Sequence, residues 1–474
     1  MIRSKLVAQL SGPAVAAMVW WIANEQGLPD EATRVLSATS WMLVWWIAEA
    51  VPLGVTSVMP MVLFPVMGIS SIAETTAPYG SHYVFLFMGG FLIALALERW
   101  DLHKRFALSV LVLAGGNPRL LIAGFMTATA VLSMWISNTA TTLMMLPIAL
   151  SVLHKVDPKI HPNFALALLL GTAYSANLGG VATLIGTPPN VAMAGVLENQ
   201  FNIEVPFLEW TLMALPFSML MLCVVYILLT RVLTPVAKGS LSEGRNEIRN
   251  ELLDLGPWRQ AECRVAAVFA VTGFLWVGRR WLVDWSGIEM SDTSIAMAAG
   301  ISLFLIPSAN RHSERLLAWK DTRNLPWDIL LLFGGGLTLA KALAEAEVLT
   351  MVAQAMAAWE GVSHGLLILL FAGVALLLTE VMSNLALTVV MVPIVGQIAL
   401  EWGANPMLLV IPVTIASSCA FMLPMATPPN AIIFGSQRIT MKEMASVGLV
   451  LNVIAAVLAW LWGIWVLPWW LQFL

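Results

Sequence analysis

The chain has 474 residues, of which 59% are hydrophobic and only 11% are charged, and its formal net charge is −4. A soluble domain carries about 25% charged residues, so this composition excludes a water-soluble globule and predicts an all-α polytopic membrane protein. The negative net charge argues against a nucleic-acid partner, and the three widely spaced cysteines argue against a disulfide framework or a zinc site.

Apolar segments that are long enough to enter a bilayer recur along the whole chain. A span needs roughly 20 predominantly apolar residues. The basic N-terminus, 1–5, precedes the first segment, as it would in a signal peptide. However, no small-residue cleavage site lies before Asn24, so we predict that this segment is the first span. The predicted segments are 6–24, 35–51, 53–70, 83–100, 119–152, 164–198, 208–235, 262–283, 293–308, 326–349, 364–400, 407–435 and 443–472.

Two of these segments, 119–152 and 364–400, are too long for one span and have polar residues near the middle. We predict that each forms a re-entrant helical hairpin, which returns to the side of the membrane where it started. The remaining segments then make about 11 crossings. The predicted parts are an N-terminal transmembrane helix (1–34), a first repeat (35–235) with the broken helix 164–198, a cytoplasmic linker (236–261) and a second repeat (262–474) with the broken helix 407–435.

The distribution of basic residues predicts the orientation in the membrane. Cytoplasmic loops carry an excess of Lys and Arg. With the N-terminus in the cytoplasm and the C-terminus outside, most of the 24 Lys and Arg residues fall in cytoplasmic segments. The exceptions, outside or at the outer boundary, are Arg34, Arg279, Arg280 and Lys341.

The second half of the chain repeats polar motifs of the first half. Ser137-Asn138 aligns with Ser383-Asn384 at an offset of 246 residues, and 187–190 aligns with 427–430 at an offset of 240. Both tetrapeptides read Thr-Pro-Pro-Asn. Each repeat has five predicted crossings, and because five is odd the second repeat must be inverted. Inverted repeats with broken helices are typical of transporters, whose binding site lies near mid-membrane where the repeats meet.

Hydroxyl and amide side chains cluster at the middle of each predicted hairpin, over 133–142 and 379–386. In hydrocarbon, irregular backbone is tolerated only where it is buried in protein or lines a wet cavity. Helix N-termini at such a break attract anions, and hydroxyl and amide oxygens can bind a cation. A single Ser-Asn pair would more often cap or bridge helices, but two pairs in register favour a binding site.

Consecutive prolines interrupt the two broken helices. Two prolines remove backbone donors and clash with the preceding turn, so each helix must break there. The exposed carbonyl groups can coordinate a hard cation, which prefers oxygen ligands. A simple kink would explain the prolines, but it would not explain the flanking Thr and Asn or their recurrence.

Fixed positive charge is missing from these motifs, because no Lys or Arg accompanies the Ser-Asn pairs or the Thr-Pro-Pro-Asn breaks. An anion at mid-membrane needs countercharge, and helix dipoles supply only part of it. Bound cations can supply the rest and would couple the two fluxes. Anion pores usually have rings of Arg or Lys, so the pattern predicts cation symport rather than a passive anion channel.

Glu49 and Glu380 are interpreted as the deep carboxylates of the apolar segments, and such groups are candidates for a function. Glu380 either tunes a cation site or packs as a hydrogen-bonded structural group. Glu49, which lies near Pro52 at a segment end, is more often structural. An intramembrane enzyme would need an acid/base pair or metal ligands at a shared cavity. No histidine cluster accompanies the two carboxylates, so no enzyme and no catalytic residues are predicted.

The two Ser-Asn tips, each followed by a Thr-Pro-Pro-Asn break, resemble the divalent anion:sodium symporter family, and so does the segment 48–53. The resemblance covers nearly the whole chain. It implies symport of sodium ions (Na+) with a C4-type dicarboxylate such as succinate, by an elevator-like motion in a homodimer. It also implies an integral protein of a bacterial inner membrane, embedded in the lipid bilayer. A dicarboxylate exchanger, or a citrate or sulfate carrier of the same fold, stays an alternative.

The resemblance also implies which residues bind the ligands. One sodium site would be formed by Ser133, Ser137, Asn138 and Gly186, and the other by Thr379, Met382, Asn384 and Ala426. The substrate carboxylates would meet Ser137, Asn138, Thr139, Thr187, Ser383, Asn384, Thr427 and Pro428. One position departs from the family pattern, because Leu385 stands where many bacterial relatives have threonine. The missing hydroxyl leaves open which anion is preferred.

Overall fold

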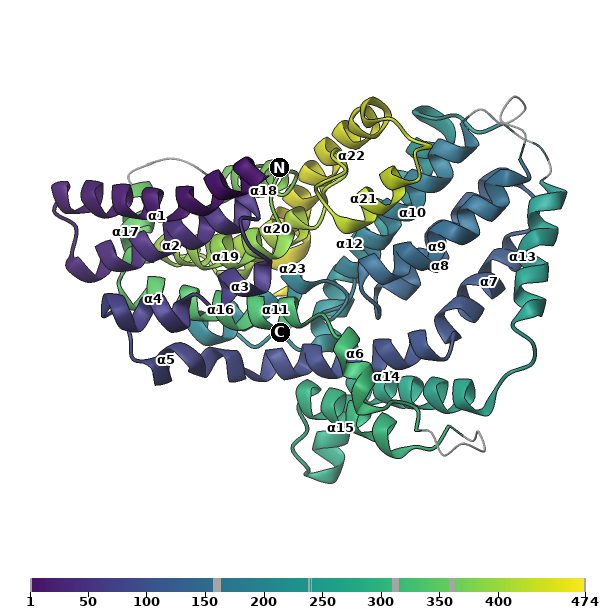
Figure 1. Ribbon diagram of the computed structural model, residues 1–474, viewed down its shortest axis with the longest axis horizontal. Coiled ribbons are helices and arrows are strands. Elements are labelled where there is room, and N and C mark those ends of the chain that lie inside the picture. The colour runs from purple at the N-terminus through teal and green to yellow at the C-terminus, as the bar shows by residue number, and fades with distance from the viewer. Residues whose placement is uncertain are drawn as a thin grey trace.

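The computed structural model describes residues 2–156, 163–237, 239, 241–308, 315–357 and 363–472. Regular structure in these residues is helical (Figure 1), apart from one isolated bridge between Pro307 and Arg315. The prediction of an all-α membrane protein is confirmed, because 8 of the described helices are long and apolar enough to cross a bilayer. Further apolar helices have only 10–17 residues, so the count of about 11 crossings stays a prediction.

The first half of the chain contains long helices joined by short ones. They are α1 (Ile2–Glu25), α2 (Asp30–Ala48), α3 (Leu53–Ser57), α4 (Pro60–Met67), α5 (Ile72–Thr76), a 3₁₀ turn (Ala77–Gly80), α6 (His82–Arg99), α7 (Leu102–Ala114), α8 (Pro118–Ser133), α9 (Asn138–His154), α10 (Phe164–Val181), α11 (Pro188–Phe201) and α12 (Phe207–Ile227) with a π turn (Leu228–Val232).

The second half has a comparable order. Its helices are α13 (Ser242–Asp254), α14 (Gln260–Ser286), α15 (Asp292–Leu305), a 3₁₀ turn (Trp319–Asn324), α16 (Trp327–Glu345), α17 (Val348–Ala357), α18 (His364–Leu378), α19 (Asn384–Glu401), α20 (Met407–Ser417), α21 (Pro428–Gly435), α22 (Met441–Leu461), a π turn (Trp462–Val466) and α23 (Leu467–Trp470).

Two predicted boundaries differ from the structure. Helix α2 begins at Asp30, so residues 30–34 belong to α2 and not to the N-terminal helix. Asp30 and Glu31 lie in its first turn, where carboxylates are favoured by the helix dipole. The segment 236–261 is also not a plain linker, because it contains α13 and the first residues of α14.

The helix pairs that carry the motifs pack against each other. α8 contacts α9 and α10, and α18 contacts α19 and α20. Contacts also join the two halves, because α21 packs on α9 and α10, and α11 packs on α19 and α20. The hairpins and broken helices therefore form one packed unit, which brings the four motifs close together.

The helix that follows each interruption begins with residues suited to that position. Pro188-Pro189 and Pro428-Pro429 occupy the first turns of α11 and α21. Proline is tolerated there because its missing N–H would have no intrahelical partner. The irregular backbone therefore lies before the prolines, at 182–187 and at 418–427.

Two short helices begin in the same unusual way. Asp101 precedes α7, Glu347 precedes α17, and both residues have a left-handed backbone with φ of 56°. Non-glycine residues rarely adopt this conformation. The two positions are separated by the same offset as the Ser-Asn motifs, as an internal duplication requires.

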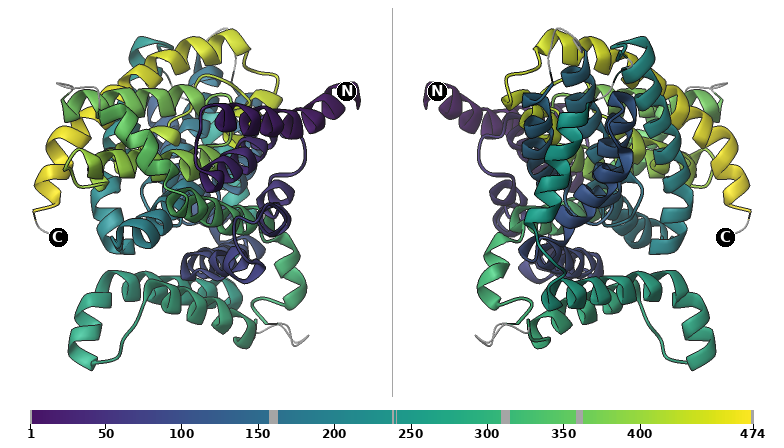
Figure 2. Two further views of the ribbon diagram at one scale, coloured as in Figure 1. Left: turned by 90° about the vertical axis from the view of Figure 1, so that its left-hand side faces the viewer. Right: turned by 90° about the vertical axis from the view of Figure 1, so that its right-hand side faces the viewer.

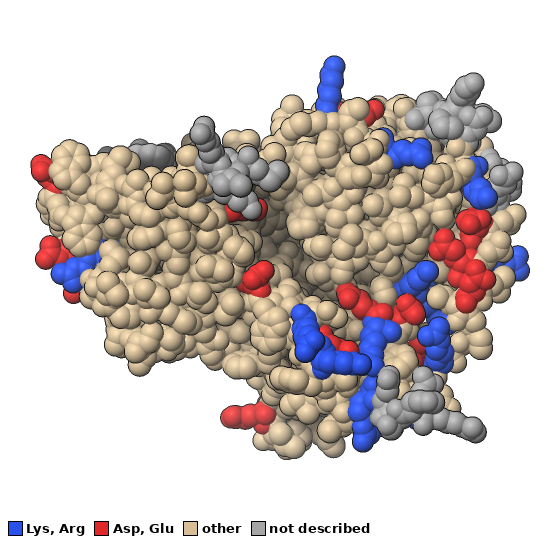
Figure 3. All heavy atoms as spheres, viewed as in Figure 1, with Lys and Arg blue, Asp and Glu red and all other residues tan. Residues whose placement is uncertain are grey.

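The arrangement in space leaves a broad uncharged surface. The N-terminal end of α1 and the C-terminal end of the chain lie on opposite sides of the molecule, and α14 and α15 extend beyond the rest of it (Figure 2). Figure 3 shows charged side chains mostly toward the side that holds α7, α13 and α14, with large tan areas elsewhere. The same view is hollowed near its centre, between the half with α1 to α4 and the half with α7 to α10.

Candidate functional site

A cavity of about 700 Å³ brings the four polar motifs together. The eight residues expected to meet the substrate, Ser137, Asn138, Thr139, Thr187, Ser383, Asn384, Thr427 and Pro428, all line this cavity. Three residues expected to bind sodium, Gly186, Met382 and Ala426, line it as well. The expected site residues are therefore neighbours in space, although they come from four helix interruptions.

Ser133 and Thr379 differ from the other expected site residues, because they do not line the cavity. Both side chains are fully buried behind the hairpin tips. Ser133 is the last residue of α8 and Thr379 directly follows α18, and each contacts the asparagine of its own tip. They can therefore reach a cation at the tip from behind, but they do not face the open cavity.

The first hairpin tip holds a cluster of oxygen atoms. Ser133 Oγ lies 2.7 Å from Asn138 Oδ1 and 2.8 Å from the carbonyl oxygen of Ala176 on α10. Ser137 caps α9, because its side chain accepts a hydrogen bond from the Ala140 N–H. A serine hydroxyl has a single proton to donate, so the two short contacts of Ser133 must share it. A cation at this point would satisfy the surplus of acceptors.

The second hairpin tip repeats these oxygen contacts, but the Ser383 side chain does not cap α19 as Ser137 caps α9. Thr379 Oγ1 lies 2.6 Å from Asn384 Oδ1 and 2.5 Å from the carbonyl oxygen of Ser417 on α20. Thr388 Oγ1 donates to the Asn384 carbonyl oxygen at 2.8 Å, as Thr142 does at the first tip. The second tip therefore has the same surplus of oxygen acceptors over protons.

Gly180, in the last turn of α10, keeps a small space open beside the first tip. A Cβ atom at this position would lie 2.6 Å from Asn138 Oδ1 and 3.1 Å from the carbonyl oxygen of Gly186. The first contact is too short for carbon and the second is tight, so a side chain at this position would crowd the space between these oxygens. Gly180 was not predicted as a site residue, although the Gly-Gly pair before the break is a signal in the sequence.

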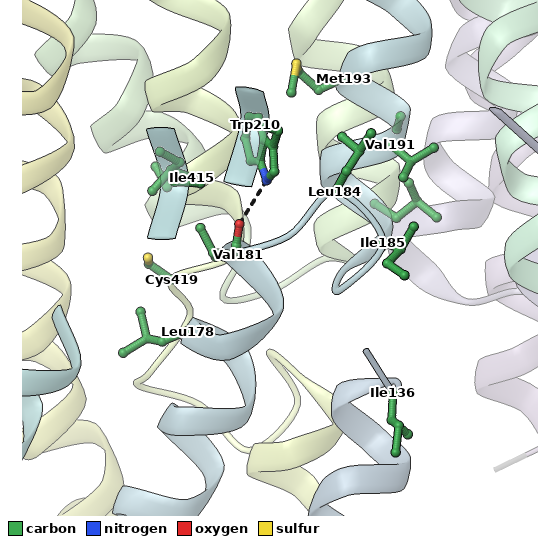
Figure 4. Close-up of a cluster of buried hydrophobic side chains, with 14 of the residues drawn as sticks. Ile136, Leu178, Val181, Leu184, Ile185, Val191, Met193, Trp210, Ile415 and Cys419 are labelled. Atoms are coloured by element: carbon green, nitrogen blue, oxygen red, sulfur yellow. Dashed lines mark hydrogen bonds between the residues drawn. The ribbon is translucent and has the colours of Figure 1, made fainter. Parts of the chain in front are cut away.

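The backbone of the first break is held by side chains. Asn190 Nδ2 donates to the carbonyl oxygens of Gly180, Val181 and Thr183 at 3.1, 3.2 and 2.8 Å. Trp210 Nε1 on α12 also donates to Val181, at 3.0 Å, and Figure 4 shows this bond among apolar side chains. Buried backbone groups need such partners, which explains why a polar Asn follows the prolines.

The second break is longer and depends on Glu380. One oxygen of this carboxylate accepts the N–H groups of Phe421 and Met422 at 2.9 and 3.0 Å, and the other accepts that of Leu423 at 2.9 Å. Asn452 Nδ2 on α22 donates to the first of these oxygens at 2.6 Å. Of the two interpretations of Glu380, these contacts favour a hydrogen-bonded structural group, which links the second tip to the second break.

Charged residues are nearly absent from the cavity wall. Among the residues that the structure describes, no Lys or Arg lines it, and Glu49 is its only ionisable residue. Glu49 ends α2 in a left-handed conformation, with φ of 44°, and its side chain is exposed. The expectation of a structural role did not anticipate that this carboxylate lies on the wall of the cavity.

The family model of the sodium:sulfate symporter transmembrane region matches residues 3–473 of the chain. The chain is 36% identical to the sodium-dependent dicarboxylate transporter SdcS of Staphylococcus saprophyticus over 464 residues, which cover 96% of this chain and 89% of that protein. It is also 36% identical to SdcS of Staphylococcus aureus over 475 residues, which cover 98% of this chain and 91% of that protein.

Solved structures with a similar fold also belong to transporters. MtrF of Neisseria gonorrhoeae, an antimetabolite efflux pump, matches with a TM-score of 0.57 at 13% identity over 95% of this chain and 97% of that chain. The YdaH transporter of Alcanivorax borkumensis matches with a TM-score of 0.52 at 15% identity over 84% of this chain and 88% of that chain. At these identities the similarity concerns the fold alone.

Proposed function

Because the chain belongs to the sodium:sulfate symporter family, we propose that it is a secondary active transporter, which carries a C4-type dicarboxylate such as succinate together with sodium ions. This is the family of divalent anion:sodium symporters that the motifs resemble. The relatives named sodium-dependent dicarboxylate transporters match over nearly the full chain, which supports both the substrate class and the coupling ion. The proposal contains no catalytic step.

The observation that carries this proposal is the pair of oxygen clusters at the hairpin tips. In each cluster a single hydroxyl proton serves two acceptors, and a sodium ion would balance the excess. The first ion would bind at Ser133, Ser137, Asn138 and Gly186. The second ion would bind at Thr379, Met382, Asn384 and Ala426, partly through backbone carbonyl groups.

The dianion would bind after the sodium ions. Helices α9, α19, α11 and α21 all begin at the cavity, and each helix N-terminus carries about half of an elementary positive charge. Because no described Lys or Arg side chain adds to this, bound sodium would supply the remaining countercharge. Sodium would therefore bind first and complete the site, and the two carboxylates would then meet the two Ser-Asn tips.

Transport would follow the elevator-like motion that the family implies. The inverted repeats 35–235 and 262–474 would each contribute a hairpin and a broken helix to a moving transport domain. The remaining helices would form a scaffold, through which two copies would associate as a homodimer in the lipid bilayer. We place the N-terminus in the cytoplasm and the C-terminus outside, in a bacterial inner membrane, because the Lys and Arg distribution obeys the positive-inside rule.

Uptake into proteoliposomes tests this proposal directly. We expect radiolabelled succinate to accumulate when an inward sodium gradient is present, and not when choline replaces sodium. Unlabelled succinate should compete more strongly than citrate or sulfate. Stronger competition by citrate or sulfate would select one of those anions as the substrate. Equal counterflow with and without a sodium gradient would contradict symport and favour the exchanger.

Leu385 offers a test of anion preference at the second tip. Its side chain lines the cavity and is 5% exposed, directly after Asn384. We expect Leu385→Thr to restore a hydroxyl donor and to lower the KM for succinate about tenfold or more, since one hydrogen bond to a charged group contributes about 1.5–3 kcal/mol. Leu385→Val, which has nearly the same shape as Thr without the hydroxyl, is the matched control. An equal KM for the two variants would contradict a carboxylate contact at this position.

A further inference from the structure

Asn177 is a polar residue of the cavity wall that belongs to none of the repeated motifs. It lies near the end of α10, and its side chain is 2% exposed. Its Nδ2 group donates to Thr427 Oγ1 at 3.1 Å, so it joins α10 to the second break. Its Oδ1 atom is buried and has no hydrogen-bond partner among the described residues. A buried acceptor without a partner is costly, and this one belongs to a residue that lines the cavity.

The second half of the chain has no counterpart to this free oxygen. The offset that aligns the two Thr-Pro-Pro-Asn breaks places Ser417 opposite Asn177. The Ser417 hydroxyl already contacts Thr388 Oγ1 at 2.9 Å and the Thr414 carbonyl oxygen at 2.8 Å. The unpartnered oxygen is therefore an addition to the pair of repeated oxygen clusters, and not a third copy of them.

Chain neighbours of Asn177 in α10 lie beside oxygen atoms of the first tip and of the first break. The preceding carbonyl group, that of Ala176, contacts Ser133 Oγ at 2.8 Å. Gly180 follows three residues later on the same face of the helix, and a Cβ there would lie 2.6 Å from Asn138 Oδ1 and 3.1 Å from the Gly186 carbonyl oxygen. Asn177, Asn138, Gly186 and Thr427 thus line one cavity.

The chemistry of the free atom limits what it can bind. An amide oxygen only accepts hydrogen bonds, and an ionised carboxylate also only accepts, so this atom cannot bind the dianion directly. No Lys or Arg in the described part of the chain lines the cavity to pair with it. We propose that Asn177 Oδ1 is a ligand of a further sodium ion, bound between the two sodium positions at the hairpin tips. This inference rests on the proposed function, which it extends.

Sodium titration of the purified protein, in detergent and without substrate, tests the inference. The melting temperature is followed as sodium chloride replaces choline chloride at constant ionic strength, because a ligand that binds the folded state raises it. Loss of even an indirect partner of a metal ligand typically costs 10–100-fold in affinity. We therefore expect Asn177→Ala to raise the half-saturating sodium concentration about tenfold or more. Asn177→Asp, which keeps an oxygen at this place, should titrate like the wild type or more tightly.

The controls separate this inference from a structural role and from the proposed function. Asn199→Ala removes an exposed asparagine whose Nδ2 donates to Gly195 within α11, and its titration should match that of the wild type. An Asn177→Ala curve equal to wild type, or an Asn177→Asp curve as weak as that of Asn177→Ala, overturns the inference. If Asn177→Ala does not fold, Asn177→Asp decides the question. A half-saturating sodium concentration of this variant that is tenfold higher than that of the wild type overturns the inference. A wild-type protein that does not respond to sodium contradicts the proposed function itself.

Discussion

Replacing Asn138 or Asn384 by alanine is expected to abolish sodium-dependent uptake. Each asparagine side chain holds one of the oxygen clusters, at 2.7 Å from Ser133 Oγ and 2.6 Å from Thr379 Oγ1. Each also lines the cavity where the dianion would bind. The alanine variants lose a cation ligand and a substrate contact together, so we expect uptake to fall to the level of protein-free liposomes.

The measurement is initial uptake of radiolabelled succinate into proteoliposomes with an inward sodium gradient. Size-exclusion profiles and melting temperatures without sodium should match those of the wild type, because the backbone bonds of the tips remain. Asn163→Ala is the matched control, since that side chain donates only to the Pro235 carbonyl oxygen at an exposed position. Sodium-dependent uptake that persists in both the Asn138 and the Asn384 variants would show that the assigned site is wrong.

Replacing Glu380 by leucine is expected to destabilise the protein severely. The change leaves one buried and two partly buried backbone N–H groups, and the buried Asn452 amide, without their acceptor. Each unsatisfied buried donor costs about 1–3 kcal/mol, so the second break should lose its conformation. We expect a large drop in melting temperature. In the protein that stays folded, we also expect a much weaker response to sodium, because Ala426 lies in the same break.

Two further variants make this result specific. Glu380→Gln keeps one acceptor oxygen, and its melting temperature should lie between those of the wild type and the leucine variant. Glu443→Gln is the matched control, because Glu443 forms an exposed capping box with Thr440 at the start of α22, and glutamine can preserve it. A Glu380→Leu protein as stable as the wild type would mean that the second break does not depend on this carboxylate.

Sequence analysis located the four helix interruptions because their polar residues recur in apolar surroundings. Ser137-Asn138 and Ser383-Asn384 stand at the starts of α9 and α19, and the two Pro-Pro pairs stand at the starts of α11 and α21. Capping residues and prolines favour a helix start through local chemistry alone. These features needed no knowledge of the packing, so the sequence was sufficient to predict them.

The parts of the site that sequence analysis missed depend on tertiary contacts. Asn177 and Gly180 lie in an apolar helix without a repeated partner, and nothing local marks the atoms they face. The role of Glu380 also required the structure, since its partners lie about forty and seventy residues further along the chain. The same reason explains the place of Ser133, whose motif did not indicate that it lies behind the tip.

The short helices α7, α13 and α17 were also missed, because none of them is long enough to form a span. A search for apolar segments of bilayer length passes over elements of 10–13 residues. Left-handed residues before α7 and α17, Asp101 and Glu347, give no clear sequence signal either. The positions of these short helices depend on where the long helices end and on which helices pack beside them.

Equilibrium binding of radiolabelled succinate to the purified protein tests the central claim most directly. The central claim is that the hairpin tips and helix breaks, which have no fixed positive charge, bind a dianion only when sodium ions are bound there. We expect saturable binding in sodium chloride and none above background in choline chloride at the same ionic strength. Equal affinity in the two salts would contradict the account, because the protein would then bind the dianion without the positive charge that sodium ions are expected to supply.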